Sequence, residues 1–168
     1  IRQNNAVPAT IAILDGVIKI GLTSYEVKKL SEKKGIKKLS RADLSAALAN
    51  GDTGATTVSA TMILAANANI KVFATGGVGG VHIGAENTFD ISADLQELSQ
   101  TPVIVISAGP KAILDLPKTL EVLETLGVPV VTFCQDELPA FWSRSSGLKS
   151  PLRMDTAKEI ARSQLVRE

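Results

Sequence analysis

The sequence predicts an α/β fold of three layers, α/β/α, with a largely parallel or mixed sheet and an N-terminal β-hairpin. Apolar, strand-like runs at residues 70–75, 103–107 and 128–133 alternate with helix-forming segments. Two consecutive strand–helix–strand crossovers give parallel strands with helices on the faces of the sheet. Near the N-terminus, Asp15-Gly16 joins two short apolar runs and favours a two-residue turn, because both turn positions need a positive φ.

The first 70 residues are predicted to hold the hairpin and three helices. Thr23 and Glu26 have the spacing of a capping box, and Ser40 is the expected N-cap of the second helix. The third helix is rich in alanine and almost uncharged, so it is expected to be buried. The predicted strands of the hairpin are residues 9–14 and 17–22, and the predicted helices are residues 24–33, 41–49 and 56–68, with a loop at 50–54.

The later helices follow from their capping residues. Ser92 is the expected N-cap of a helix that runs to residue 99. A second helix is expected over residues 112–126, kinked or split by Pro117 and ended by Gly127 in the left-handed conformation. A short amphipathic helix is expected from about Thr156.

Composition bounds the class of protein. A length of 168 residues suits one domain, and 45% hydrophobic residues give it a substantial core. A formal net charge of +1 gives no electrostatic reason to expect a nucleic acid or an anionic membrane as partner. Cys134 is the only cysteine, which excludes an internal disulfide and a cysteine-based metal cluster, and it is expected to be buried.

From the sequence we expect neither a membrane-spanning segment nor a secretion signal. It contains no run of 18 or more apolar residues and no charged leader followed by an apolar segment. We therefore expect no membrane partner and a cytoplasmic location.

The glycine-rich segment at residues 75–82 follows the first strand of the alternating region. It has a histidine where a dinucleotide-binding loop has its third glycine, and it lacks the lysine and hydroxyl residue of a P-loop. Contact of its backbone amides with a phosphate or sugar, and a tight turn without ligand, both remain open.

Ligands of open parallel sheets bind beyond the carboxyl ends of the strands. By this rule we expect one edge of the sheet to hold the glycine-rich segment, His82, Asp90, Asp94 and Lys111. His82 is the only histidine, so it cannot belong to a multi-histidine metal site, and a structural role and a substrate contact are equally open.

Two aspartates precede or begin the helix capped by Ser92. Asp94 lies in the first turn, where the helix dipole alone explains an acid. Asp90 lies outside the helix, and a single carboxylate completed by water molecules is a common way to hold Mg²⁺ or Mn²⁺. Metal binding at Asp90 is therefore one interpretation of this acid.

Lys111 follows Gly109-Pro110 at the end of a strand and is predicted to open a helix. The helix dipole and partial burial would lower its pKa and favour the neutral amine, the form that attacks carbonyl carbon. An exposed lysine beside the loop is the alternative. The spacing from Ser107 is one residue longer than in serine–lysine acyl transfer.

Four lysines cluster before the second helix, and such a cluster is ordinarily a solvated surface. Lys38 lies nearest to the capped helix and is the best candidate among them to contact an anionic substrate.

Nine collinear segments make the chain resemble the pseudouridine-5′-phosphate glycosidases, also called indigoidine synthase A-like proteins. The resemblance covers nearly the whole chain, and together the segments are highly specific. They are Ala6 to Thr10, Gly21 to Thr23, Ser40 to Leu44, Gly54 to Val58, Phe73 to His82, Asp90 to Leu95, Ala108 to Lys111, Leu126 to Pro129 and Pro139 to Trp142.

The resemblance implies reversible cleavage of the C–C glycosidic bond of pseudouridine 5′-phosphate to uracil and ribose 5-phosphate. It implies that Lys111 adds covalently to C1′ of the opened sugar and that Asp90 holds Mn²⁺, largely through waters. It further implies a homotrimer. The substrate-contacting positions that it implies are Lys38, Val58, His82, Ser92, Ala93 and Asp94.

The chain departs from the family in several places. Ile83 stands where arginine is common, and Pro110 where alanine is common. The resemblance places the general acid, a glutamate, before the match to Ile1, and places further pocket residues beyond Glu168. The single domain is therefore expected to be truncated at both ends relative to the family.

The sequence leaves two other functions to consider. A truncated, non-catalytic chain of the same family, associated with intact subunits, is the main alternative to an active glycosidase. A nucleotide-binding dehydrogenase rests only on the glycines and fails on their spacing.

Overall fold

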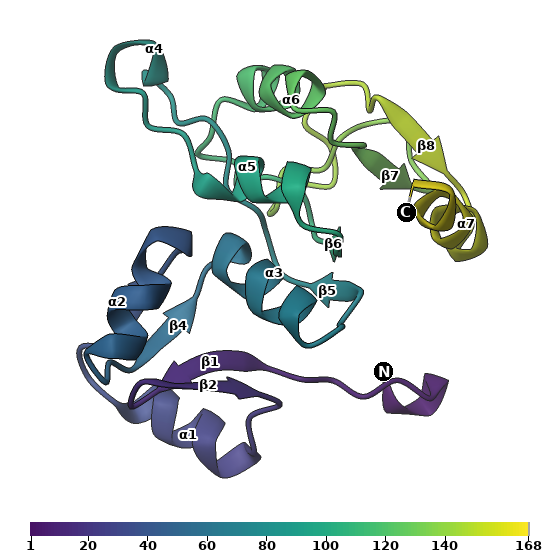
Figure 1. Cartoon of the computed structure of the whole chain (residues 1–168). Coiled ribbons are helices and arrows are strands. Elements are labelled where there is room, and N and C mark those ends of the chain that lie inside the picture. The colour runs from purple at the N-terminus through teal and green to yellow at the C-terminus, as the bar shows by residue number, and fades with distance from the viewer. Residues whose placement is uncertain (168) are drawn as a thin grey trace. The chain divides into compact units, whose positions relative to one another are not determined.

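The computed structural model describes residues 1–167 of the 168-residue chain. The chain divides into two compact units, unit 1 from Ile1 to Ile70 and unit 2 from Lys71 onward (Figure 1). No helix among residues 1–167 has the length and apolar character needed to cross a membrane. The single-domain expectation stays a prediction.

Unit 1 is built on a four-stranded mixed sheet with strand order β2-β1-β4-β3. Strand β1 pairs antiparallel with both β2 and β4, and β3 pairs parallel with β4. The elements of this unit are η1 (Arg2–Asn4), β1 (Ile11–Leu14), β2 (Val17–Ile20), α1 (Ser24–Glu32), β3 (Lys37–Leu39), η2 (Arg41–Asp43), α2 (Leu44–Ala49), β4 (Gly54–Thr56) and α3 (Val58–Asn67).

The hairpin and the first capping box are confirmed. Leu14 faces Val17 across a turn in which Asp15 and Gly16 have φ of 49° and 73°. The Thr23 hydroxyl accepts a hydrogen bond from the Glu26 amide at 3.2 Å, and the Glu26 carboxylate accepts one from the Thr23 amide at 2.8 Å. The Glu26 carboxylate accepts hydrogen bonds from both the amide and the hydroxyl of Thr23, and these two bonds, the one from the amide first, lower its pKa.

The sequence did not predict β3 and β4. Gly54 belongs to the predicted loop at 50–54, but in the structure it begins β4 and packs against Leu39 of β3. A Cβ at residue 54 would overlap the Leu39 side chain, so this glycine permits close packing inside a parallel pair. Beyond β4, the Thr57 hydroxyl caps α3, and this helix is buried along most of its length, as predicted.

Unit 2 contains two separate pairs of parallel strands, β5 with β6 and β7 with β8. The α/β class with mixed sheets is therefore confirmed, but the second predicted crossover does not add β7 to the β5–β6 pair. The elements of this unit are β5 (Val72–Ala74), α4 (Ala85–Thr88), α5 (Ala93–Gln100), β6 (Ile104–Ile106), α6 (Leu116–Thr125), β7 (Val131–Phe133), β8 (Leu152–Met154) and α7 (Ala157–Arg167).

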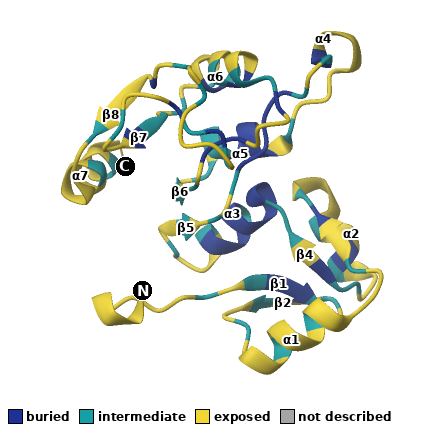
Figure 2. Cartoon of the chain, turned by 180° about the vertical axis from the view of Figure 1, so that it is seen from behind, coloured by how far each residue is buried: buried dark blue, intermediate teal, exposed yellow. Residues whose placement is uncertain are grey.

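The core of unit 2 joins the glycine-rich segment to α5 and α6. Val81, Ala85, Leu95 and Leu123 form a buried cluster, and the burial is visible around α5 in Figure 2. Because α5 and α6 pack through this cluster, the loops that precede both helices are held beside residues 76–82.

The start of α6 differs from the prediction. The helix begins at Leu116, with Asp115 as N-cap, and not at residue 112. Pro117 lies in the first turn, where a missing amide hydrogen costs nothing, so it neither kinks nor splits the helix. Lys111 is therefore outside the helix. Gly127 has a φ of +68° after the helix, as predicted.

The prediction for Cys134 is also wrong. Cys134 is exposed and has a φ of 56°, and its thiol donates to the Asp155 carbonyl at 3.3 Å. The chain turns out of β7 at this residue, which carries the side chain away from the core.

Candidate active site

The loops that leave β5 and β6 lie side by side, as expected for the carboxyl ends of parallel strands. The Ala108 amide donates to the Gly76 carbonyl at 2.9 Å, and the Val78 amide donates to the Gly109 carbonyl at 3.2 Å. Val78 and Pro110 form a parallel β-bridge. The glycine-rich segment and the loop that carries Lys111 are thus joined through main-chain hydrogen bonds.

Close packing explains why this segment is rich in glycine. A Cβ on Gly77 would overlap the ring of Phe141, and one on Gly80 would lie 2.9 Å from the Thr119 methyl group. A Cβ on Gly79 would overlap Ser92 and lie 2.8 Å from an oxygen of Asp94. These glycines have a structural reason that is independent of any ligand.

Three amides of the segment already have acceptors within the chain. The Val78 amide is bonded to Gly109, the Gly79 amide to the Asp94 carboxylate at 2.9 Å, and the Val81 amide to the Thr119 hydroxyl at 2.9 Å. A phosphate cradle formed by these three amides is therefore excluded, because each donor is used.

Ser92 and Asp94 hold the start of α5 against the glycine-rich segment. The Ser92 hydroxyl caps the helix by accepting from the Asp94 amide at 3.2 Å, as predicted. The Ser92 amide donates to the Gly80 carbonyl at 3.0 Å. Asp94 is only 7% exposed, whereas Ala93 between them is exposed. Ala93 is therefore the most accessible residue of this stretch.

His82 and Asp90 face each other across the segment that contains α4. The His82 amide donates to the Asp90 carbonyl at 3.0 Å, and the Nδ1 atom lies 3.8 Å from an Asp90 carboxylate oxygen. Their side chains are 41% and 64% exposed. An imidazole and a carboxylate are thus held close together and open to solvent.

Lys111 lies between two bridges to the glycine-rich segment. Pro110 pairs with Val78, and Leu114 pairs with His82. The Lys111 amide donates to the Val78 carbonyl at 3.3 Å. These bridges place the Lys111 loop next to the segment that carries His82.

The side chain of Lys111 does not have the predicted environment. It is exposed, and among residues 1–167 its ammonium group has no hydrogen-bond or ion-pair partner. The helix dipole does not act on it directly, because α6 begins five residues later. The expected burial and the expected place at a helix N-terminus are therefore both absent for Lys111.

Lys38 and Val58 belong to unit 1. Lys38 lies in the middle of β3 and is exposed, whereas Val58 is the first residue of α3 and is 7% exposed. The neighbouring Lys33 pairs with Asp15 at 3.4 Å, and Lys37 pairs with Asp52 at 2.6 Å. Neither Lys34 nor Lys38 has such a pair within the described part of the chain, so pairing does not choose between them, and the assignment of Lys38 stays a prediction.

The donor set for a metal is small. Residues 1–167 contain no group of three or more histidine, cysteine, aspartate or glutamate side chains that could enclose a metal. Asp90 offers one exposed carboxylate with an imidazole beside it. This set fits a hard divalent cation that keeps several waters, because such ions need only one or two protein carboxylates.

Two structural contacts at the site were missed by sequence reasoning. Thr119, fully buried in α6, accepts from Val81 and donates to the Asp115 carbonyl at 2.7 Å. Lys118 bridges Asp115 at 2.8 Å and Glu86 of α4 at 2.9 Å, and these two acids raise its pKa. Asp115 before Pro117 is a helix-start signal that could have revealed the cap; nothing in the sequence marked Thr119.

The α/β fold and the joined loops after β5 and β6 are those of a known protein family. The family described as indigoidine synthase A like protein matches residues 1–168, and the chain belongs to it. The pseudouridine-5'-phosphate glycosidase of Jannaschia sp. (strain CCS1) is 68% identical over 167 residues, covering 99% of this chain and 55% of that protein. The corresponding glycosidase of Paracoccus denitrificans is 64% identical, with 99% and 56% covered.

Solved structures agree with the family assignment. The prealnumycin C-glycosynthase AlnA, crystallised with ribulose 5-phosphate, matches with a TM-score of 0.94 and 44% identity over 99% of this chain and 55% of that one. An indigoidine synthase A-like protein from Thermotoga maritima matches with a TM-score of 0.88 and 39% identity, covering 94% and 52%. The chain thus spans about 55% of the length of the curated relatives described here.

Proposed function

We propose that this chain forms the central part of a pseudouridine-5′-phosphate glycosidase, which cleaves a C–C glycosidic bond to give uracil and ribose 5-phosphate. The observation that carries the proposal is the 68% identity to the Jannaschia glycosidase over 99% of this chain. The joined loops of Lys111 and His82 support it, because they bring an amine and an imidazole to one edge of unit 2.

Lys111 is the proposed nucleophile. The C1′–O4′ bond breaks first and O4′ takes up a proton, and the Lys111 amine then bonds to C1′ of the opened sugar and loses a proton. The bond from C1′ to the uracil carbon then breaks, its electron pair stays with uracil, and that carbon is protonated. The nitrogen lone pair forms a C=N bond to C1′, which water hydrolyses to ribose 5-phosphate and the free amine.

This route suits a carbon leaving group. Ordinary glycosidases protonate a leaving oxygen between two carboxylates, and a C–C bond offers no such oxygen. Here the nitrogen lone pair instead expels the uracil carbon as the C=N bond forms, and the expelled carbon takes up a proton. The exposed position of Lys111 supports access for an opened sugar.

Asp90 is the proposed Mn²⁺ ligand, and His82 is the nearest additional donor. A divalent cation would supply positive charge and ordered waters near the sugar phosphate. Lys38, Val58, Ser92, Ala93 and Asp94 are the remaining proposed substrate contacts. Asp94 is proposed to act through the Gly79 main chain, since its carboxylate is buried. A homotrimer and a cytoplasmic location are part of the same proposal.

The test uses a chimera in which this chain replaces the matched 55% of the Jannaschia glycosidase. Uracil release from pseudouridine 5′-phosphate is measured with Mn²⁺ for the chimera, the Jannaschia protein and this chain alone. We expect similar rates for the chimera and the Jannaschia protein. A folded chimera that releases no uracil would contradict the proposal.

The chain alone is expected to turn over about 10²–10⁴-fold more slowly than the chimera, the range that a positioned general acid contributes. If the chain alone is inactive but co-purifies with the full-length protein, the non-catalytic alternative is favoured for this chain. Full activity of the chain alone would contradict the assignment of a separate general acid.

A further inference from the structure

Thr119 of α6 is a buried residue between the two segments that carry Lys111 and His82. It lies one turn after Asp115, the N-cap of the helix, and its exposed fraction is 0%. Because no part of Thr119 is open to solvent, it cannot contact a substrate directly. Any effect of Thr119 on the site must therefore pass through the residues that it contacts.

The hydroxyl of Thr119 joins two segments through two hydrogen bonds. It donates to the Asp115 carbonyl at 2.7 Å and accepts from the Val81 amide at 2.9 Å. A hydroxyl has one proton to donate, so the bond to Asp115 uses that proton and leaves a lone pair for Val81. Partners on both sides thus fix the orientation of this hydroxyl.

Val81 is held at both of its main-chain groups. Its carbonyl accepts from the Asp115 amide at 2.8 Å, while its amide donates to Thr119. The preceding residue, Gly80, has no room for a side chain, because a Cβ there would lie 2.5 Å from the Thr119 hydroxyl oxygen. The start of α6 therefore fixes the chain directly before His82.

The main-chain contacts of His82 lead on to the Lys111 loop. The His82 amide donates to the Asp90 carbonyl at 3.0 Å, and His82 forms a β-bridge with Leu114. The Leu114 amide in turn donates to the Lys111 carbonyl at 3.0 Å. One set of main-chain contacts thus links His82 to the loop of the proposed nucleophile.

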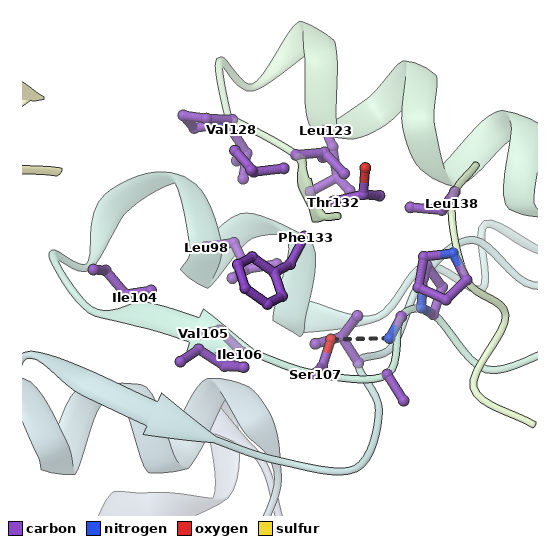
Figure 3. A pocket seen from close by; sticks show the side chains of 18 of the residues that line it. Leu98, Ile104, Val105, Ile106, Ser107, Leu123, Val128, Thr132, Phe133 and Leu138 are labelled. Atoms are coloured by element: carbon purple, nitrogen blue, oxygen red, sulfur yellow. Dashed lines mark hydrogen bonds between the residues drawn. The ribbon is translucent and has the colours of Figure 1, made fainter. Parts of the chain in front are cut away.

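The loop that carries Lys111 is anchored at both ends. At its start, the Gly109 amide donates to the Ser107 hydroxyl at 3.1 Å, the bond drawn as a dashed line in Figure 3. At its end, the Asp115 carbonyl accepts from the hydroxyl and the amide of Thr119, at 2.7 and 2.9 Å. The Ser107 bond is local to the loop, whereas the Thr119 hydroxyl also reaches the glycine-rich segment.

We propose that Thr119 is a positioning residue of the site: its hydroxyl holds His82 at a fixed place relative to the Lys111 loop. The consequence for catalysis rests on the proposed function, which gives His82 and Lys111 their roles. A misplacement of about 1 Å, even by a mutation far from the chemistry, can cost about a hundredfold in rate. The positioning itself exists without substrate or metal and is measured separately.

The first measurement is amide hydrogen exchange on this chain without substrate or metal. Thr119→Val keeps the shape of the side chain and removes the hydroxyl, so the Val81 amide loses its acceptor. We expect the His82 amide to exchange at least about tenfold faster in this variant, although its own acceptor, the Asp90 carbonyl, is unchanged.

Two control variants separate the hydroxyl from general destabilisation. Thr119→Ser keeps the hydroxyl and should leave exchange at His82 within about threefold of the unaltered chain. Thr132→Val makes the same change in β7, where the buried Thr132 hydroxyl donates to the Gln135 carbonyl at 2.6 Å beside the cavity shown in Figure 3. It should not speed exchange at His82. The Ile104 amide, bonded at 2.9 Å to the chain just before β5, reports any loss of stability common to unit 2.

The second measurement is kinetic and uses the chimera described above. Thr119→Val should lower kcat/KM for uracil release about tenfold to a hundredfold, and Thr119→Ser should restore most of it. If Thr119 acts through His82, the two substitutions are not additive, so Thr119→Val should cost less than about threefold in a His82→Ala background. A residue that only stabilised the fold would cost the same factor in both backgrounds.

Three results would overturn the proposal. They are unchanged exchange at His82 in Thr119→Val, equally fast exchange in Thr132→Val, and the same loss of kcat/KM with and without His82. Should Thr119→Val not fold, Thr119→Cys takes its place, because a thiol is a weak acceptor and the expected direction is the same. A chimera that releases no uracil contradicts the proposed function, and the exchange measurement then decides the positioning on its own.

Discussion

The carboxylate of Asp94 accepts a hydrogen bond from the amide of Gly79 at 2.9 Å, and both groups are buried. This bond connects the first turn of α5 to the segment that leaves β5. Because a Cβ on Gly79 would lie 2.8 Å from an Asp94 oxygen, the two residues depend on each other's size and chemistry. The contact sets the path of the chain towards His82, and through it the geometry of the proposed site.

The first prediction concerns Asp94. Asp94→Ala leaves the buried Gly79 amide without an acceptor, which should lower the free energy of unfolding by about 1–3 kcal/mol. Asp94→Asn keeps an acceptor oxygen and should lose less. Urea unfolding of the three proteins measures this. Equal stability of Asp94→Ala and the unaltered chain would show that the Gly79 bond does not stabilise the segment.

The second prediction concerns the space around Gly79. Gly79→Ala adds a methyl group against Ser92 and Asp94 and should destabilise the fold by about 1–3 kcal/mol through overpacking. Gly127→Ala is the matched control, since its Cβ meets nothing within 4 Å and only its φ of +68° opposes the change. Its cost should be about 1 kcal/mol. Thermal unfolding compares the two, and a larger loss for Gly127→Ala would refute the packing argument.

The third prediction concerns pH and Asp115. Hydrogen bonding with Lys118 lowers the pKa of Asp115 below its usual value of 3.8. A lowered folded-state pKa stabilises the fold above pH 3.8, and this contribution disappears as the pH falls through the folded-state value. Asp115→Asn keeps a capping side chain and removes the charge.

Melting temperatures at pH 7 and pH 3 test this contribution. The unaltered chain should melt higher than Asp115→Asn at pH 7, by a margin of the order of one degree for an exposed pair. The margin should shrink at pH 3. A margin that grows on acidification would have the wrong sign for this cause.

The fourth prediction concerns Mn²⁺. Asp90→Asn removes the only carboxylate proposed to hold the ion and should weaken Mn²⁺ binding about tenfold or more. Glu86→Gln is the control, because Glu86 is an exposed acid on the neighbouring α4 that pairs with Lys118. Electron paramagnetic resonance of free Mn²⁺ gives both affinities. Equal binding by Asp90→Asn and the unaltered chain would remove Asp90 from the metal site.

Local chemistry made much of the fold predictable. The Asp15-Gly16 turn, the capping box at Thr23 and Glu26, and the Ser92 cap each depend on a few adjacent residues, and all are present. The convergence of the loops after β5 and β6 followed from the rule for parallel strands.

Most of the wrong or missing predictions concern features that depend on contacts between residues distant in the sequence. β3 and β4 have three residues each, and their pairing depends on the contact of Gly54 with Leu39. Whether Lys111 is exposed depends on which residues pack over its loop, and the neighbouring sequence does not predict this packing. For α6, the sequence offered Asp115 and Pro117 as a start signal, and placing the start at residue 112 gave that signal too little weight.

The most direct test of the account is borohydride trapping of the covalent intermediate on the chimera described above. Incubation with ribose 5-phosphate and borohydride, followed by peptide mass spectrometry, locates the reduced sugar adduct. We predict a single dominant adduct on Lys111, absent from Lys111→Ala and from Lys111→Arg. An adduct that persists at the same yield in Lys111→Ala would contradict the central claim that this amine attacks the sugar.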